Sequence, residues 1–163
     1  MLRVDHAGEV GACRIYAGQL AVMGDRSPTA TAIAGMAAQE ARHRHRFDAM
    51  MTARGVRPTL LTPLWDVAGF ALGAATALMG PRAAMACTVA IETEIDRHYA
   101  GQLASLGDSD PELAETVAAF RADEADHRKT ALAAGAERAP GYPILSRAIR
   151  LGCRAAIALS RRL

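Results

Sequence analysis

The feature that most constrains this chain is an internal repeat. Residues 16–21 (YAGQLA) return unchanged as residues 99–104, which is 83 positions later. In the same frame, each copy carries one glutamate that is followed 31 or 32 residues later by a Glu-x-x-His pair. The repeated polar residues are Glu9, Glu40 and His43 in the first copy and Glu92, Glu124 and His127 in the second. The repeat predicts two helix hairpins, about residues 1–54 and 82–136, related by a pseudo-two-fold axis and joined by residues 55–81.

The composition indicates that the repeated segments are helical. Alanine contributes 37 of the 163 residues, whereas valine and isoleucine together contribute 14 and aromatic residues 4%. Sheets favour branched and aromatic side chains, while alanine favours helices and lets their axes approach. The length suits a single domain over residues 1–163. A charged fraction of 22% and a net charge of +2 exclude a disordered acidic chain and a strongly basic protein that binds nucleic acid.

Proline and glycine mark the ends of six expected helices, at about 3–23, 28–54, 63–79, 82–106, 111–134 and 143–162. Ser27, Thr62 and Asp110 each precede a proline, as a capping side chain does at a helix start. Glycines stand where C-terminal caps are needed, at Gly24, Gly55, Gly80, Gly107 and Gly135. Four of the helices are long enough for a bundle. The sequence therefore predicts an all-α four-helix bundle, with an apolar connecting helix and a basic C-terminal helix added.

The repeated acidic and histidine residues predict a metal centre inside this bundle. Residues i and i+3 share one helical face, so Glu40 with His43, and Glu124 with His127, can point inward together. Four helices then supply four carboxylates and two imidazoles, which is the ligand set of ferritin-like di-iron carboxylate bundles. Two divalent cations would neutralise carboxylates that are otherwise costly to bury. Oxygen and imidazole donors favour iron or manganese over a structural zinc site.

Stretches along the whole chain resemble the demethoxyubiquinone hydroxylase family of ubiquinone biosynthesis. They are residues 5–9 (DHAGE), 14–19 (RIYAGQ), 63–65 (PLW), 69–74 (GFALGA), 84–90 (AMACTVA), 152–154 (GCR) and 159–160 (LS) before 161–163 (RRL). The resemblance implies six metal ligands at Glu9, Glu40, His43, Glu92, Glu124 and His127. It also implies a ferritin-like bundle with two iron ions, and O2-dependent hydroxylation of a polyprenylated demethoxy-benzoquinol ring.

The source of electrons for such a reaction stays open in the sequence. There is no Gly-x-Gly-x-x-Gly motif, so no dinucleotide-binding fold is expected within the chain. The reductant could be a nicotinamide nucleotide such as NADH acting directly, the quinol, or a separate reductase.

Tyr99 and His98 are further candidate catalytic residues. Tyr99 follows Glu92 by two helical turns and should lie beside the metals, and the resemblance suggests that the pair lies near the quinone pocket. Tyr16 holds the equivalent place in the other copy, so both tyrosines could simply pack the bundle. Asp123 could orient a ligand imidazole by accepting its hydrogen bond, or could be a surface charge.

Two segments suggest a membrane surface. Residues 59–80 carry one charge, Asp66, and are long enough to span a bilayer. A single span would separate the two halves of the metal centre. We therefore expect this segment to lie at the interface with Trp65 at headgroup level, or to cap the bundle as a core helix. The C-terminal helix, about 143–163, carries an arginine stripe that could face anionic lipid, at Arg147, Arg150, Arg154 and Arg161.

These features predict a peripheral protein, on the cytoplasmic face of a bacterial inner membrane or the matrix side of the mitochondrial one. The arginine stripe could equally dock a second copy of this chain or an accessory protein of ubiquinone biosynthesis. Two other functions stay open. One is a non-enzymatic, iron-handling ferritin-like protein, and the other is a membrane-bound helical adaptor whose Glu and His residues are surface charges.

Overall fold

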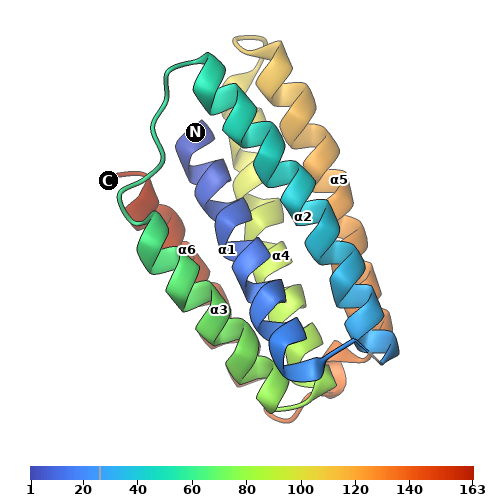
Figure 1. Cartoon of the computed structure of the whole chain (residues 1–163). Helices are drawn as coiled ribbons and strands as arrows, with labels where there is room; N and C mark the ends of the chain where they lie inside the picture. The colour runs from blue at the N-terminus through green and yellow to red at the C-terminus, as the bar shows by residue number, and fades with distance from the viewer. Residues whose placement is uncertain (26) are drawn as a thin grey trace.

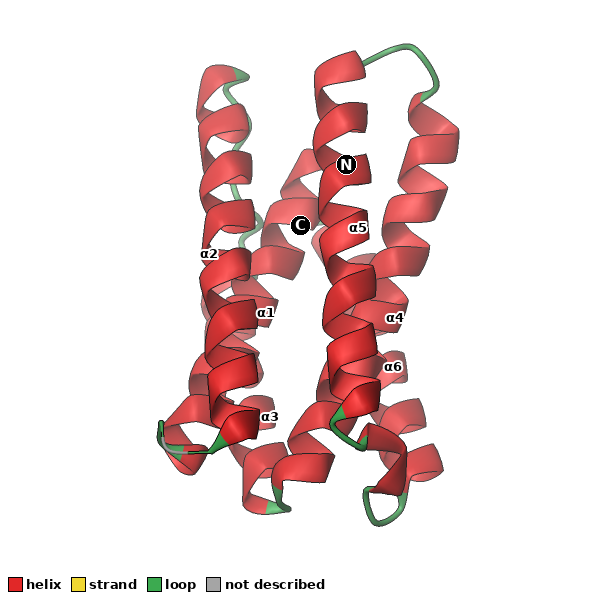
Figure 2. Ribbon diagram, turned by 90° about the vertical axis from the view of Figure 1, so that its right-hand side faces the viewer, coloured by secondary structure: helices red, strands yellow, loops and turns green. Residues whose placement is uncertain are grey.

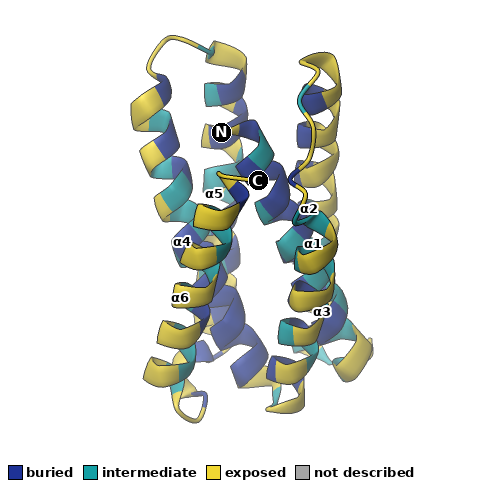
Figure 3. Cartoon of the chain, turned by 90° about the vertical axis from the view of Figure 1, so that its left-hand side faces the viewer, coloured by how far each residue is buried: buried dark blue, intermediate teal, exposed yellow. Residues whose placement is uncertain are grey.

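A computed structural model describes residues 1–25 and 27–163, in which the α-helices form three layers (Figure 1). The helices are α1 (Leu2–Met23), α2 (Pro28–Ala53), α3 (Thr62–Leu78), α4 (Pro81–Leu106), α5 (Pro111–Ala133) and α6 (Tyr142–Ser160), with a short 3-10 helix at Ala136–Arg138. Helices α1 and α4 form the middle layer. Helices α2 and α5 cover one side of it, as Figure 2 shows, and α3 and α6 cover the other (Figure 3). The predicted all-α bundle with two added helices is confirmed.

The helix ends lie within two residues of those predicted, because the local signals act as expected. The Ser27 hydroxyl accepts a hydrogen bond from the backbone N–H of Ala30 at 3.0 Å, and the Asp110 carboxylate accepts one from that of Leu113 at 3.2 Å. The predicted capping glycines all have positive φ. The prediction for Thr62 is wrong, since it lies inside α3 and its hydroxyl donates to a carbonyl.

Small residues allow α3 to pack directly on α1. A Cβ atom at Gly73 would lie 1.9 Å from the carbonyl oxygen of Ile15, so the two backbones are nearly in contact there. The single charged residue of the apolar segment also contacts α1, because the Asp66 carboxylate forms an ion pair with Arg14 at 3.0 Å. The outer face of this segment exposes apolar side chains, at Leu60, Leu64, Val67 and Leu78. One face of α3 is therefore packed, and the other is open (Figure 3).

Within the described residues, no helix combines the length and the apolar character needed to cross a bilayer.

An ion-pair cluster holds α6 against α4. The carboxylate of Glu94 is buried and accepts hydrogen bonds from Arg150 at 2.6 Å and from Arg154 at 3.0 Å. Further along α6, Arg161 lies 3.3 Å from the ring of His98. Two arginines of the stripe, Arg150 and Arg154, therefore have a buried acid on the neighbouring helix as a partner, and contact of the stripe with lipid stays a prediction.

The glycine contact between α1 and α3 gives a direct test of this packing. We expect Gly73→Ala to lower the free energy of unfolding by about 3 kcal/mol, because overpacking forces the two helices apart. Gly35→Ala is the matched control, since a Cβ atom on that exposed residue of α2 meets nothing within 4 Å. It should raise the stability by up to about 1 kcal/mol through helix propensity. Urea unfolding measures both, and equal effects would contradict the close approach.

Candidate metal centre

The six predicted ligands converge in the middle of the bundle, and all are buried. Donor atoms lie within 4.8 Å of one another in two groups, which are Glu9, Glu40, His43 and Glu124, and Glu40, Glu92, Glu124 and His127. Helices α1, α2, α4 and α5 each contribute to the site. Because Glu40 and Glu124 belong to both groups, the arrangement suits two neighbouring cations that share these two carboxylates. This convergence is what the repeat predicted.

Both imidazoles turn the Nδ1 atom towards the carboxylates. In His43 this atom lies 3.3 Å from Glu124 and 3.5 Å from Glu9. In His127 it lies 3.0 Å from Glu124 and 3.1 Å from Glu40. Each ring thus offers one nitrogen to the centre and keeps the other for an outer partner.

Unsatisfied oxygen atoms show that the site suits cations. Buried carboxylate oxygens in all four glutamates accept no hydrogen bond from residues 1–25 or 27–163, at Glu9 Oε2, Glu40 Oε1 and Oε2, Glu92 Oε2 and Glu124 Oε1. Buried polar atoms are normally paired, because an unpaired one costs about 1–3 kcal/mol. Metal ligation would satisfy several of these carboxylate oxygens at once. Iron or manganese fits this set of oxygen and imidazole donors.

The electrostatics of the cluster also favour positive charge. Burial, with repulsion from Glu9 and Glu124, raises the pKa of Glu40 well above its usual range. Burial and repulsion from Glu124 likewise raise the pKa of Glu92. Burial alone would lower the pKa of His43, but the nearby carboxylates of Glu124 and Glu9 outweigh it and raise the pKa to about 10. Burial opposes ionisation of Glu124 too, but contacts with His127 and His43 lower its pKa to about 2. A metal ion would favour the charged form of all these carboxylates.

The outer nitrogen of each imidazole meets a polar residue of the facing helix. The Nε2 atom of His43 lies 2.9 Å from the carboxylate of Asp123, so the predicted hydrogen bond of Asp123 is confirmed. The Nε2 atom of His127 lies 3.2 Å from the amide oxygen of Gln39. Sequence reasoning missed Gln39, although it precedes Asp123 by the 84 positions that separate the two copies.

Two tyrosines hold the remaining pair of carboxylates, each from the opposite copy of the repeat. The phenol of Tyr16 donates to Glu92 at 2.6 Å, and that of Tyr99 donates to Glu9. Burial and the neighbouring carboxylates raise the pKa of both phenols well above the usual value, so they stay protonated as donors. Tyr99 therefore lies beside the centre as expected, and Tyr16 holds the equivalent place. A catalytic role of Tyr99 stays a prediction.

His98 lies outside the ligand cluster. Its ring contacts the buried carboxylate of Asp5 at 2.8 Å and faces Arg161 on its other side. It lines a polar cavity of about 550 Å³ between α4 and α6, together with Arg97 and Arg154. Its catalytic role stays a prediction.

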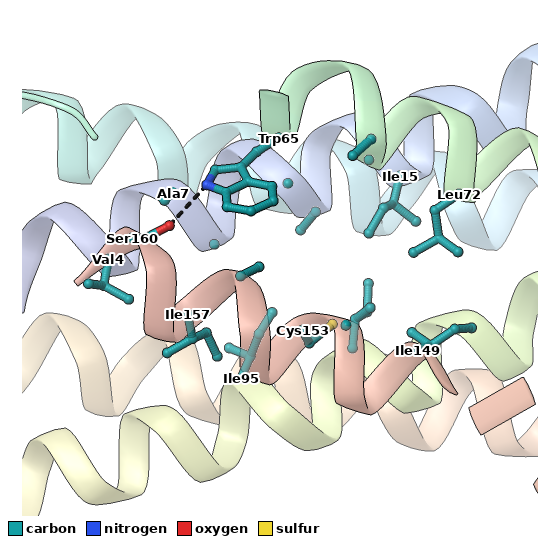
Figure 4. Close-up of a pocket in the computed structure, with 18 of the residues that line it drawn as sticks. Val4, Ala7, Ile15, Trp65, Leu72, Ile95, Ile149, Cys153, Ile157 and Ser160 are labelled. Carbon is teal, nitrogen blue, oxygen red and sulfur yellow. Dashed lines mark hydrogen bonds between the residues drawn. The ribbon is translucent and has the colours of Figure 1, made fainter. Parts of the chain in front are cut away.

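An apolar cavity of about 540 Å³ lies between α3 and α6, over α1 and α4 (Figure 4). Its lining includes Gly8 and Ile91, which are the chain neighbours of Glu9 and Glu92. The cavity therefore passes beside the helical turns that carry these two ligands, which we call the metal-binding level. At one end the indole N–H of Trp65 donates to the hydroxyl of Ser160 at 2.9 Å and links the two outer helices. The sequence did not predict this cavity or the contact of Trp65 with α6, and a place for Trp65 at headgroup level stays a prediction.

Metal binding can be tested through stability. Anaerobic addition of two equivalents of Fe(II) or Mn(II) should stabilise the chain, by about 2.7 kcal/mol per site at a hundredfold excess over Kd, and chelation should reverse this. Glu40→Gln should remove most of the gain, because a shared ligand is lost, without destabilising the metal-free protein. Glu115→Gln, at an exposed position of α5, is the control. Calorimetry with metal analysis measures the effect, and a melting temperature indifferent to chelation would instead support an adaptor without chemistry.

Comparison with known proteins agrees with this geometry. The family described as "Ubiquinone biosynthesis protein COQ7" matches residues 1–160. The 3-demethoxyubiquinol 3-hydroxylase of Rhodospirillum rubrum is 54% identical over 161 residues, which cover 99% of this chain and 76% of that protein. The NADPH-dependent 3-demethoxyubiquinone 3-hydroxylase of Mus musculus is 52% identical over 166 residues, with coverages of 99% and 76%. The 5-demethoxyubiquinone hydroxylase of Saccharomyces cerevisiae is 42% identical, with coverages of 96% and 74%. The chain belongs to the COQ7 family of ubiquinone biosynthesis proteins.

Proposed function

We propose that this chain is a di-iron monooxygenase that hydroxylates the ring of a polyprenylated demethoxyubiquinol with O2. The observation that carries the proposal is the convergence of two equivalent ligand sets whose carboxylate oxygens are buried and unpaired. The names of the relatives supply the substrate class. An apolar cavity beside the ligands supports a long, greasy substrate, which neither an iron store nor an adaptor requires.

In the overall reaction, one oxygen atom of O2 enters a ring C–H bond and the other leaves as water, with two electrons and two protons taken up. Two bound iron ions would supply the reduction of O2. Glu40 and Glu124, which belong to both groups, would hold the two ions together with Glu9 and His43 on one side and Glu92 and His127 on the other. The phenols of Tyr16 and Tyr99 hold two of these carboxylates in place, and the surrounding helices exclude water from the centre.

The apolar cavity is the site that we assign to the isoprenoid chain. It is lined by α1, α3, α4 and α6 and contains hardly any polar side chains besides Trp65 and Ser160, which bond to each other. Small residues form its wall on α1, at Gly8, Gly11 and Ala12, next to the ligand Glu9. A substrate tail bound along this wall would hold the quinol ring near the metal-binding level.

The polar cavity is the site that we assign to the reductant. Several relatives are named as NADPH-dependent, and a nicotinamide nucleotide carries phosphate groups that arginines bind well. Arg97, Arg154 and Arg161 line this cavity, and His98 lies on its wall. Oxidation of NADPH or NADH to NADP+ or NAD+ would release the two electrons and one of the two protons, and solvent would supply the other proton. His98 would then contact the reductant and not the metals.

The exposed apolar side chains of α3 and α6 suit the surface of a membrane that holds the substrate. They flank the apolar cavity, and include Leu64, Val67, Ile144, Leu151 and Leu159. A substrate with an isoprenoid tail resides in the bilayer, so a protein docked by this face can take it up without exposing the tail to water. This placement suits the cytoplasmic face of a bacterial inner membrane or the matrix face of a mitochondrial one.

The reaction has a direct test. Iron-loaded protein with NADPH or NADH and a demethoxyubiquinol should form a hydroxylated product, and one atom of labelled O2 should appear in it by mass spectrometry. Glu124→Gln should abolish product formation because it removes a shared ligand, while Glu115→Gln should retain it. If no reductant supports hydroxylation by protein that contains two iron ions, the proposed activity is wrong.

Filling the apolar cavity should separate tail binding from chemistry. A phenylalanine in place of Ala156 would project into the cavity and displace the tail. We expect the KM for a long-tailed quinol to rise about tenfold, as ~1.4 kcal/mol of lost binding would produce. Turnover of a short-chain analogue should change little. Ala155→Phe, at an exposed neighbouring position, is the control, and equal effects of Ala156→Phe on both substrates would contradict the assignment.

A further inference from the structure

The two metal positions have the same ligands. Each position is surrounded by one unshared glutamate, one histidine and the two shared carboxylates of Glu40 and Glu124. Each unshared glutamate accepts a hydrogen bond from a buried tyrosine. Each imidazole turns its Nδ1 atom towards the centre. In these respects the pseudo-two-fold symmetry of the repeat is preserved.

The symmetry is broken behind the imidazoles. Asp123 places a carboxylate 2.9 Å from the Nε2 atom of His43, whereas its counterpart Gln39 places an amide oxygen 3.2 Å from that of His127. The ring of His43 also stacks on Phe120, with 3.9 Å between the centroids. The residue 84 positions before Phe120 is a methionine, so this contact too belongs to one copy.

A carboxylate and an amide affect an imidazole ligand differently. A carboxylate that accepts the outer N–H increases the electron donation of the ring to a metal, and such charge-assisted bonds are shorter and stronger than neutral ones. A negative charge close to one metal position also favours the higher oxidation state of the metal ion there. An amide oxygen supplies the hydrogen bond without the charge, so it orients His127 but donates less.

We propose that Asp123 and Gln39, acting as positioning residues, make the two metal positions chemically unequal, so that the iron beside His43 is oxidised before the iron beside His127. This inference rests on the proposed di-iron centre, and it adds that the centre releases its electrons in a fixed order. Each one-electron step converts one Fe(II) to Fe(III) and passes the electron to an external acceptor.

An anaerobic redox titration of the iron-loaded protein tests the inference. One-electron mediators serve as acceptors, and Mössbauer and EPR spectra follow each iron. We expect two separated one-electron potentials and, in the half-oxidised form, a charge localised on one iron. Asp123→Asn should raise the lower potential, because the first iron loses its carboxylate-supported histidine. Gln39→Glu should lower the higher potential, because the second iron gains such support.

The double variant D123N/Q39E and a control complete the design. The double variant exchanges the two outer partners, so the separation of the potentials should return with the order of oxidation reversed. Asp126→Asn removes an exposed charge of the same helix that pairs with Lys129, and it should shift neither potential. If this variant shifts them as Asp123→Asn does, a general charge effect is responsible and the inference is wrong.

Two results separate this inference from the proposed function. If the protein binds two iron ions whose spectra are identical, or if Asp123→Asn and Gln39→Glu move both potentials together, the inequality is refuted while the metal centre stands. If the protein binds no iron, the proposed function fails as well. Circular dichroism of each variant confirms that the fold is unchanged.

Discussion

Burial of four carboxylates at one point is the constraint on which the rest of this structure depends. Repulsion and desolvation make such a cluster unfavourable by itself, and they raise the pKa values of Glu40 and Glu92. Two imidazoles and two phenols relieve part of it, and metal cations would relieve the remainder. The four central helices are therefore arranged around a feature that costs stability unless a bound metal compensates it.

The middle layer of α1 and α4 has two faces with different chemistry. One face presents Glu9 and Glu92 to the metal-binding cluster, and the other forms the floor of the apolar cavity. Adjacent residues such as Gly8 and Glu9 point to different sides of a helix. A single helical turn can therefore line the apolar cavity and also carry a metal ligand. The outer helices α3 and α6 then define the cavity, and the buried carboxylate of Glu94 fixes α6 in position.

The sequence predicted those parts of the structure that depend on local or repeated signals. Cap residues such as Ser27 and Asp110 fixed helix starts, and the duplicated Glu-x-x-His pairs identified the cluster. The sequence did not predict the cavity, because that space lies between α3 and α6, which the Trp65–Ser160 hydrogen bond links at one end, and no local pattern records such a gap. The contact of Arg150 and Arg154 with Glu94 was not predicted either, because the spacing of the arginines does not indicate whether lipid or a buried acid lies opposite.

Fusion of two hairpins in one polypeptide has an evolutionary consequence. In a dimer of identical hairpins, any substitution would appear on both sides of the axis, so both histidines would always have the same neighbour. Once the copies are encoded separately, each can diverge while its partner keeps the ligands. The contrast between Asp123 and Gln39 therefore requires two separately encoded copies of the hairpin.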